Sequence, residues 1–352
     1  MLAAEGLDGV LLTEEANRFY ATGFPSPGTD GIALITRRGA HYFTDARYTV
    51  AAERALADRM TLGAVSAERG YFSLIGEIIR REGLDVLGID EACMTVSFYE
   101  KCKQELDCTF AEASRPLAAL RVEKDAEEIR RIRHAQVITD EAFAAILPAV
   151  RVGATEREVA ARLQYEMLRR GAEKMSFDPI VVSGENGAMP HGVPSDRKIG
   201  AGEFVTMDFG CVAEGYCSDM TRTVAVGSVS DEMRLVYETV LRAQVAAIAA
   251  TKAGATGAQI DGVARRIIEK AGYGAYFSHS YGHGVGVEIH ELPHLAPRGK
   301  TPLPAGAVAS AEPGIYLPGH FGVRIEDLIL VTENGCENLT HAPKELLILP
   351  VK

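Results

Sequence analysis

The sequence predicts two domains, an α/β domain over residues 1–120 and an α+β domain over residues 121–352. The first part alternates short apolar runs with helical patterns, which is typical of an α/β domain. The remainder has long helical stretches followed by glycine-rich, strand-like segments, which favours an α+β domain. A chain of 352 residues is long enough for each domain to bury its own core.

In the first domain, strands are expected where apolar and β-branched residues cluster between turn residues. These strands lie near residues 9–12, 31–36, 40–44 and 85–90. Helices are expected at 49–60 and 71–83, where apolar residues recur every three or four positions. The alternation of the two patterns is the order expected of a small α/β domain.

The second domain is expected to begin with a long amphipathic helix after Pro116. The apolar residues at roughly helical spacing there are Ile129, Ile132, Phe143 and Ile146. We therefore place the domain boundary near residues 116–124. Further helices are expected at about 155–170 and 231–252, and glycine-rich strands follow them.

Composition and charge exclude several classes of protein. The 37 Lys and Arg against 48 Asp and Glu give a net charge of −11 without a basic stripe, so nucleic acid is not an expected partner. No segment approaches about 18 uninterrupted apolar residues, and the N-terminus lacks a basic signal-peptide start, so we expect no membrane association and a cytoplasmic location. The six cysteines lack CxxC spacing and are expected to be thiols.

Two aspartates lie inside strand-like runs. Residues 203–227, EFVTMDFGCVAEGYCSDMTRTVAVG, are typical of two strands joined by a turn, with Asp208 on one strand and Asp219 on the other. If Ala213 and Glu214 form the turn, the two aspartates face each other with Cβ atoms about 5 Å apart. A longer loop would change this register, and a single Asp is more often exposed or in a turn. Two half-buried acids at this distance would need a cation.

Histidines and glutamates occur further along the chain among glycines and strand-like residues. Residues 279–295, HSYGHGVGVEIHELPHL, hold four of the nine histidines. Glu312 in SAEPGIYLPG and Glu326 in GVRIEDLILV each lie in an apolar setting, and Arg324 shares the alternating face of Glu326. These segments add further candidate ligands to the two aspartates.

Two short motifs in this region resemble a zinc-binding motif and a phosphate-binding loop, but neither assignment fits the surrounding sequence. HELPH, residues 290–294, matches the H-E-x-x-H zinc motif, but that motif requires a helix, which Pro293 and the preceding glycines oppose. The glycines of GHGVG are not followed by the Lys and Ser or Thr of a phosphate-binding loop. We expect these glycines to let backbone approach a site closely.

Five motifs, in order, resemble those of the pita-bread metallopeptidases, the family that includes Xaa-Pro aminopeptidase, prolidase and methionine aminopeptidase. They are FDPIVVSGENGAMPHG, VTMDFGCVAEGYCSDMTRT, HSYGHGVGVEIHE, AEPGIY and GVRIED, within residues 177–327. The first 120 residues, with ANRFYATGF and FTDARY, resemble the N-terminal domain of the creatinase and proline-specific branch, which methionine aminopeptidases lack. The resemblance implies a creatinase-like α/β domain followed by an α+β pita-bread catalytic domain.

The resemblance implies a dinuclear metal site. Its ligands would be Asp208, Asp219, His283, Glu312 and Glu326. In the family pattern Asp219 and Glu326 bridge both ions, Asp208 binds one ion, and His283 and Glu312 bind the other. Four carboxylates balance the charge of two divalent cations, and an oxygen-rich set suits Mn(II), with Co(II), Fe(II) or Zn(II) as substitutes.

The resemblance also implies catalytic and substrate-binding residues. The catalytic residues would be His191, His290 and Glu312, and the substrate-binding residues His279, Arg324 and Phe177. Glu312 would shuttle a proton, and the two catalytic histidines would contact the leaving nitrogen and the carbonyl oxygen, in an order that stays open. Arg324 would contact the substrate or support the site. Two other histidines, His294 and His320, are expected to be structural or exposed.

The implied activity is hydrolysis of the bond between an N-terminal residue and a following proline, with metal ions that activate water. A prolidase restricted to dipeptides and an aminopeptidase P that accepts longer chains both fit. The alternative is a broad-specificity or methionine-type aminopeptidase. A metal-free creatinase-like hydrolase and a noncatalytic peptide-binding module are less favoured, because either should have lost ligands. Proline-specific relatives are commonly dimers or larger, so a homodimer is expected.

Overall fold

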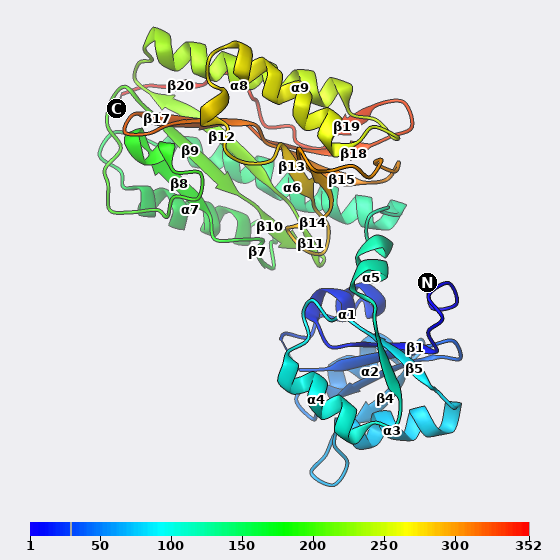
Figure 1. Cartoon of the computed structure of the whole chain (residues 1–352). Coiled ribbons are helices and arrows are strands. Elements are labelled where there is room, and N and C mark those ends of the chain that lie inside the picture. The colour runs from blue at the N-terminus through cyan, green and yellow to red at the C-terminus, as the bar shows by residue number, and fades with distance from the viewer. Residues whose placement is uncertain (29, 352) are drawn as a thin grey trace. The chain divides into compact units, whose positions relative to one another are not determined.

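The computed structural model describes residues 1–28 and 30–351, which form two compact units (Figure 1). One unit comprises Met1–Arg121 and the other Val122–Lys352. Within the described part of the chain, no helix is both long enough and apolar enough to cross a membrane. All six cysteines are free, which confirms the prediction of thiols.

The first unit is a six-stranded mixed sheet with helices on both faces. In sheet order the strands are β4 (Thr61–Ala64), β3 (Ala40–Thr44), β2 (Ile32–Thr36), β1 (Gly9–Leu12), β5 (Val86–Ile89) and β6 (Thr109–Glu112). The helices are α1 (Glu15–Thr22), α2 (Thr49–Leu56), α3 (Tyr71–Glu82), α4 (Val96–Glu105) and α5 (Ser114–Leu120). Leu11 of β1 packs in a cluster with α3 and α4, whereas Val10 and Leu12 pack with α2 and α5.

The α/β prediction for this unit is confirmed, with four strands and two helices where the pattern placed them. The pattern misses β4 and β6, the two edge strands of the sheet. Their residues are exposed or only partly buried, so no continuous apolar run marks them in the sequence.

The second unit contains two mainly antiparallel sheets and two smaller ones. The first sheet has the order β20 (Ile348–Leu349), β12 (Met220–Val226), β9 (Glu203–Phe209) and β8 (Ile180–Ser183). The second has the order β14 (Glu291–Leu295), β13 (Gly282–Gly284), β15 (Val308–Ala311), β18 (Asp327–Val331) and β19 (Cys336–Asn338). The small sheets are β11 (Tyr216–Cys217), β10 (Cys211–Ala213) and β7 (Lys174–Met175), and β16 (Gly314–Leu317) with β17 (Phe321–Arg324).

Two pairs of helices cover these strands from opposite sides (Figure 1). The helices are α6 (Ala126–Ile146), α7 (Glu156–Leu168), α8 (Asp231–Ala250) and α9 (Gly257–Lys270), with short 3-10 helices η1 (Leu147–Ala149), η2 (Gly184–Ala188) and η3 (Gly274–Tyr276). Helices α6 and α7 share an apolar cluster with β9 and β12, and α8 and α9 share another with β15 and β18. The α+β prediction is therefore confirmed, including the predicted helices at α7 and α8.

The hairpin that carries the two aspartates has a different register from the predicted one. Asp208 in β9 pairs with Thr221 in β12, not with Asp219. The turn is centred on Glu214 and Gly215, which have positive φ values of 50° and 77°, as a two-residue type I′ turn requires. The predicted turn, one residue earlier, is wrong because it excludes this glycine. The pairing moves by two residues, so Asp208 and Asp219 still share a face of the sheet.

Toward Asp208, the shared face of β9 is polar, and the opposite face is apolar. Val205, Met207 and Phe209 pack in the cluster with α6 and α7. The alternating residues Thr206 and Asp208 therefore point away from that cluster, toward β17, where Thr206 contacts the carbonyl of Gly322 and Asp208 contacts Arg324. The hairpin thus buries its apolar face and leaves a polar one available for a site.

The glycine-rich segment forms strands that lie unusually close together. A Cβ atom on Gly282 would lie 2.1 Å from the backbone oxygen of Ser310, and one on Gly284 would lie 2.1 Å from that of Leu292. Only glycine therefore allows β13 to pair between β14 and β15. Residues 291–294 of the HELPH segment belong to strand β14, which confirms that the segment is not a zinc-binding helix.

Candidate active site

A cavity of about 570 Å³ lies in the second unit, and every residue predicted for the site lines it. These residues are Phe177, His191, Asp208, Asp219, His279, His283, His290, Glu312, Arg324 and Glu326. His294 is exposed, as expected, and also lines this cavity. His320 is exposed and lines a separate hollow.

The acidic residues and His283 come from strands of both large sheets. Asp208 is near the end of β9, and Asp219 directly precedes β12. His283 is the middle residue of β13, Glu312 directly follows β15, and Glu326 directly precedes β18. The cavity therefore lies where the polar face of the first sheet meets the second sheet.

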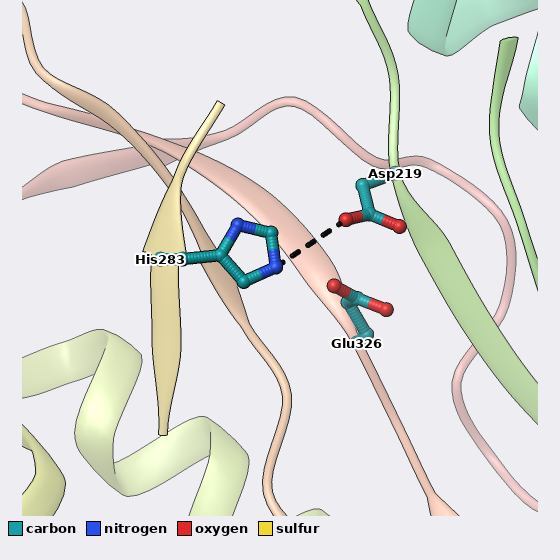
Figure 2. Close-up of side chains that lie close together, drawn as sticks. All are labelled: Asp219, His283 and Glu326. Atoms are coloured by element: carbon teal, nitrogen blue, oxygen red, sulfur yellow. Dashed lines mark ion pairs between the residues drawn. The ribbon is translucent and has the colours of Figure 1, made fainter. Parts of the chain in front are cut away.

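Asp219, His283 and Glu326 form the tightest group of possible ligands. One side-chain ligand atom from each lies within 4.8 Å of the others. The residues Asp219 and Glu326 are only 3 % and 1 % exposed. Figure 2 shows the three side chains pointing toward one another, with His283 Nε2 3.7 Å from Asp219 Oδ2. Two buried carboxylates and an imidazole thus converge on one point.

Glu312 joins this group through His283 and a serine. Its Oε1 lies 3.3 Å from His283 Nε2. Ser310 Oγ donates a hydrogen bond to Glu312 Oε1 at 3.1 Å and accepts one from the backbone N–H of His283 at 3.0 Å. Ser310 therefore fixes both candidate ligands relative to each other, a role that the sequence pattern does not reveal.

Asp208 and Glu326 are linked by Arg324 and Thr221. Arg324 Nη2 donates to Asp208 Oδ2 at 2.5 Å, and Arg324 Nε donates to Thr221 Oγ1 at 3.0 Å. Thr221 Oγ1 in turn donates to Glu326 Oε2 at 2.6 Å. The other oxygen of Asp208, Oδ1, is buried and has no hydrogen-bond partner among the described residues. It is therefore available as a ligand atom.

A chain of hydrogen bonds leads from Arg324 to His279. Arg324 Nη1 donates to the Tyr316 hydroxyl at 2.8 Å, and this hydroxyl lies 2.8 Å from His279 Nε2. His279 Nδ1 lies 2.8 Å from the Ser280 carbonyl, which can only accept, so Nδ1 carries a proton and Tyr316 donates to Nε2. Burial lowers the pKa of His279, in agreement with a neutral ring. Tyr316 ends the AEPGIY motif, but the sequence assigns it no role.

His290 and His191 lie on the exposed side of the cavity. The ring of His290 lies 4.3 Å from that of His283, measured between centroids, in an edge-to-face arrangement. Burial and the charge of His283 lower the pKa of His290. His191 lies on the loop between η2 and β9. Both are thus accessible to a bound molecule without belonging to the group of acids.

The electrostatics of the site favour a cation. Burial raises the pKa of Asp208, Asp219 and Glu326, and neighbouring carboxylates raise those of Asp219 and Glu326 further. Burial opposes charge on Glu312 and His283 too, but their hydrogen bond lowers the pKa of Glu312 to about 2 and raises that of His283 to about 9. The four carboxylates therefore face two cationic side chains, those of His283 and Arg324.

These residues fit divalent metal ions. Carboxylate oxygens with one imidazole nitrogen form a donor set that Mn, Fe, Co and Zn ions accept. The cluster of Asp219, His283 and Glu326 supplies closely spaced ligand atoms, and the unpartnered Asp208 Oδ1 supplies another. Positive ions would remove the repulsion between the acids.

Two family models match the chain. Residues 130–333 match metallopeptidase family M24, and residues 1–122 match the Creatinase/Prolidase N-terminal domain. The fold is therefore that of a metal-dependent hydrolase of peptide bonds, a class that uses divalent metal ions.

Curated relatives and solved structures agree with this class. The chain is 39 % identical to an Xaa-Pro dipeptidase of Pyrococcus horikoshii, over 97 % of this chain and 95 % of the relative. Xaa-Pro dipeptidase from Bacillus anthracis superposes with a TM-score of 0.93 at 42 % identity, covering 99 % of this chain and 97 % of the other. X-Pro aminopeptidase from Thermotoga maritima gives 0.92 at 36 %, covering 98 % of each chain. The chain belongs to metallopeptidase family M24, which confirms the resemblance found in the sequence.

Proposed function

We propose that the chain hydrolyses the peptide bond between an N-terminal residue and a following proline, with two divalent metal ions, of which Mn(II) is preferred. The observation that carries this proposal is the convergence of four carboxylates and His283 in one cavity that also contains His191 and His290. The names of the relatives, Xaa-Pro dipeptidase and X-Pro aminopeptidase, support the choice of bond.

Asp208, Asp219, His283, Glu312 and Glu326 would hold the two ions. Asp219 and Glu326, which group with His283 and lie beside the other acids, would be central members of this ligand set. When bound, the ions supply Lewis-acid polarisation of the scissile carbonyl and lower the pKa of the attacking water. Arg324 uses its donors on Asp208, Thr221, Tyr316 and Pro190, which favours support of the site over direct contact with the substrate.

The remaining residues would move protons and position the peptide. Glu312, whose Oε1 lies 3.3 Å from His283 Nε2, would take a proton from the attacking water. His191 and His290 face the cavity outside the acidic cluster and can donate to the carbonyl oxygen or the leaving nitrogen. The prolyl nitrogen, like any amide nitrogen, must gain a proton to leave as an amine.

The lining of the cavity also includes apolar residues that suit a proline ring. Phe177, Ile180, Val193 and Ile289 line it beside the polar residues. A rigid ring without an N–H group is recognised by shape and apolar contact, since it offers no amide donor.

Metal analysis combined with an activity assay tests the proposal. We expect the purified protein to bind two equivalents of Mn(II), to lose hydrolysis of Ala-Pro after chelation, and to regain it when Mn(II) is restored. Activity that survives complete removal of metal would contradict the dinuclear assignment and would favour a metal-free hydrolase.

A digest of Ala-Pro and Ala-Pro-Ala separates the two kinds of proline-specific peptidase. We expect the dipeptide to be cleaved, because the relatives at 39 % and 40 % identity are named Xaa-Pro dipeptidases. Faster cleavage of the tripeptide would instead assign the chain as an aminopeptidase. We further propose a homodimer in the cytoplasm; the six free cysteines support a reducing compartment.

A further inference from the structure

We propose that Glu156 is a positioning residue that holds the loop carrying His191 in its working geometry; this inference rests on the function proposed for His191. The His191 loop comprises residues 184–194 and connects Ser183, at the end of β8, with Ser195. Five consecutive residues of this loop line the cavity, namely Pro190, His191, Gly192, Val193 and Pro194. The shape of the loop therefore determines where His191 meets a substrate.

One buried carboxylate joins the two ends of this loop. Glu156, the first residue of α7, is 0 % exposed. Its Oε1 accepts hydrogen bonds from the backbone N–H and the hydroxyl of Ser183, at 2.7 and 2.9 Å. Its Oε2 accepts from the backbone N–H and the hydroxyl of Ser195, at 3.1 and 2.7 Å. Asn186 Nδ2, inside the loop, donates to both oxygens at 3.1 and 3.2 Å.

Backbone contacts extend this clamp along α7. The N–H of Glu156 donates to the carbonyl of Arg197, and that of Arg157 donates to the carbonyl of Ser195, both at 3.1 Å. On the cavity side, Arg324 Nη1 donates to the carbonyl of Pro190 at 3.2 Å. His191 itself is exposed, so the hydrogen bonds of the loop, more than side-chain packing, fix its position.

The chemistry of this clamp requires a carboxylate at residue 156. Its five donor groups need a partner that only accepts, and an ionised carboxylate offers two such oxygens. A carboxylate is also favoured in the first turn of a helix by the helix dipole. In Glu156→Gln the volume is kept, but the new NH₂ group faces N–H and O–H donors, so hydrogen bonds at one end of the loop are lost.

A matched pair of variants tests the clamp. Glu156→Gln is compared with Glu166→Gln, which removes a buried carboxylate from the same helix; Glu166 pairs with Arg162 and Arg170 and not with the loop. In the Mn(II)-loaded enzyme we expect Glu156→Gln to lower kcat for Ala-Pro about 10- to 100-fold with unchanged metal content, since displacement of a catalytic group by about 1 Å can have this effect. Glu166→Gln should change kcat less than about threefold.

A double-mutant cycle shows whether Glu156 acts through His191. Added to His191→Ala, Glu156→Gln should lower kcat by less than about threefold. The same large loss in both backgrounds would overturn the proposal, as would an unchanged kcat in the single variant. If Glu156→Gln does not fold, Glu156→Asp, which keeps the charge but shortens the side chain, takes its place in the cycle.

Hydrogen exchange measures the clamp independently of activity. We expect faster amide exchange in residues 184–194 of Glu156→Gln than in Glu166→Gln. Unchanged exchange in an active enzyme would refute the clamp. If exchange in residues 184–194 is faster in Glu156→Gln but the unaltered Mn(II)-loaded protein cleaves no Xaa-Pro peptide, the clamp is supported and the proposed function is refuted.

Discussion

Asp219 and Glu326 have the least favourable surroundings in the cavity, because both carboxylates are buried close to other acids. These acids could be predicted from the sequence, since a carboxylate within an apolar strand is costly unless it has a partner. Ser310, Thr221 and Tyr316 could not, because hydroxyl residues are common in strands and only their spatial partners reveal what they hold.

Metal content and turnover of single variants distinguish metal ligands from catalytic residues. His191→Ala or His290→Ala should keep the bound metal and lower turnover by about 10²- to 10⁴-fold, because each removes a positioned donor. Asp219→Ala should lose metal. His320→Ala, an exposed histidine at a separate hollow, is the control and should leave kcat unchanged. A metal-free His191→Ala protein would make His191 a ligand and contradict this division.

The pKa shifts predict how metal stabilises the protein at different pH. The pKa values of Asp219 and Glu326 are raised in the folded protein by burial and by neighbouring acids, and that of His283 is raised to about 9 by Glu312. Raised pKa values favour folding at low pH, and this contribution is lost as pH rises through them. Glu312, with its pKa lowered to about 2, has the opposite sign, but its contribution changes only below about pH 4.5.

As pH rises from about 5.5 to 8.5, the chelated protein should therefore lose stability. In the loaded protein, bound cations offset the negative charge of the same carboxylates, so the loss should be smaller. We expect the difference in Tm between Mn(II)-loaded and chelated protein to widen as pH rises across this range. The comparison is made by calorimetry in matched buffers. A difference that stays constant or narrows would show that these groups are not linked to metal binding.

At the scale of elements, the strands of the hairpin could be predicted from the sequence, but their register could not. Two strands and a turn could be predicted from the alternation of residues 203–227, but the register depended on which residues accept positive φ. Glu214 and Gly215 do, so the pairing differs from the predicted one. The edge strands β4 and β6 were missed for a related reason, because exposed strands lack an apolar signal.

Arg222, between Thr221 and Thr223 of β12, ties this hairpin to the rest of the unit. Its guanidinium is buried and donates to Asp327 Oδ1 at 2.7 Å and to the carbonyl of Ala342 at 2.8 Å. Arg222→Met should destabilise the protein by about 2–3 kcal/mol, because several buried acceptors lose their donor while Asp327 keeps its pair with Lys344. Arg133→Met, which breaks the exposed pair with Glu337, should cost less than about 1 kcal/mol. Equal losses in denaturant unfolding would contradict this role of Arg222.

At the scale of the whole molecule, the order of α/β and α+β parts could be predicted because periodicity and chain length depend on local sequence. The cavity could not be derived from spacing, since its residues come from strands of two different sheets. Only the resemblance of five motifs to a known family brought the ten site residues together before the structure did.

The assembly is predicted at this scale too. We expect a homodimer, with a mass in solution of twice 37.8 kDa, because the resemblance to proline-specific peptidases implies a dimer or a larger assembly. Light scattering over a range of concentrations checks it. A single 37.8 kDa species at working concentration would refute the dimer.

The central claim is that this metallopeptidase selects proline in the second position, and the most direct test is the ratio of kcat/KM for Ala-Pro and Ala-Ala with the Mn(II)-loaded enzyme. The apolar lining residues Phe177, Ile180, Val193 and Ile289 suit the proline ring, and His191 and His290 can protonate its nitrogen as it leaves. We predict a ratio of at least about ten, or roughly 1.4 kcal/mol of transition-state discrimination. Equal values for the two dipeptides would contradict proline selectivity and identify a broad-specificity aminopeptidase.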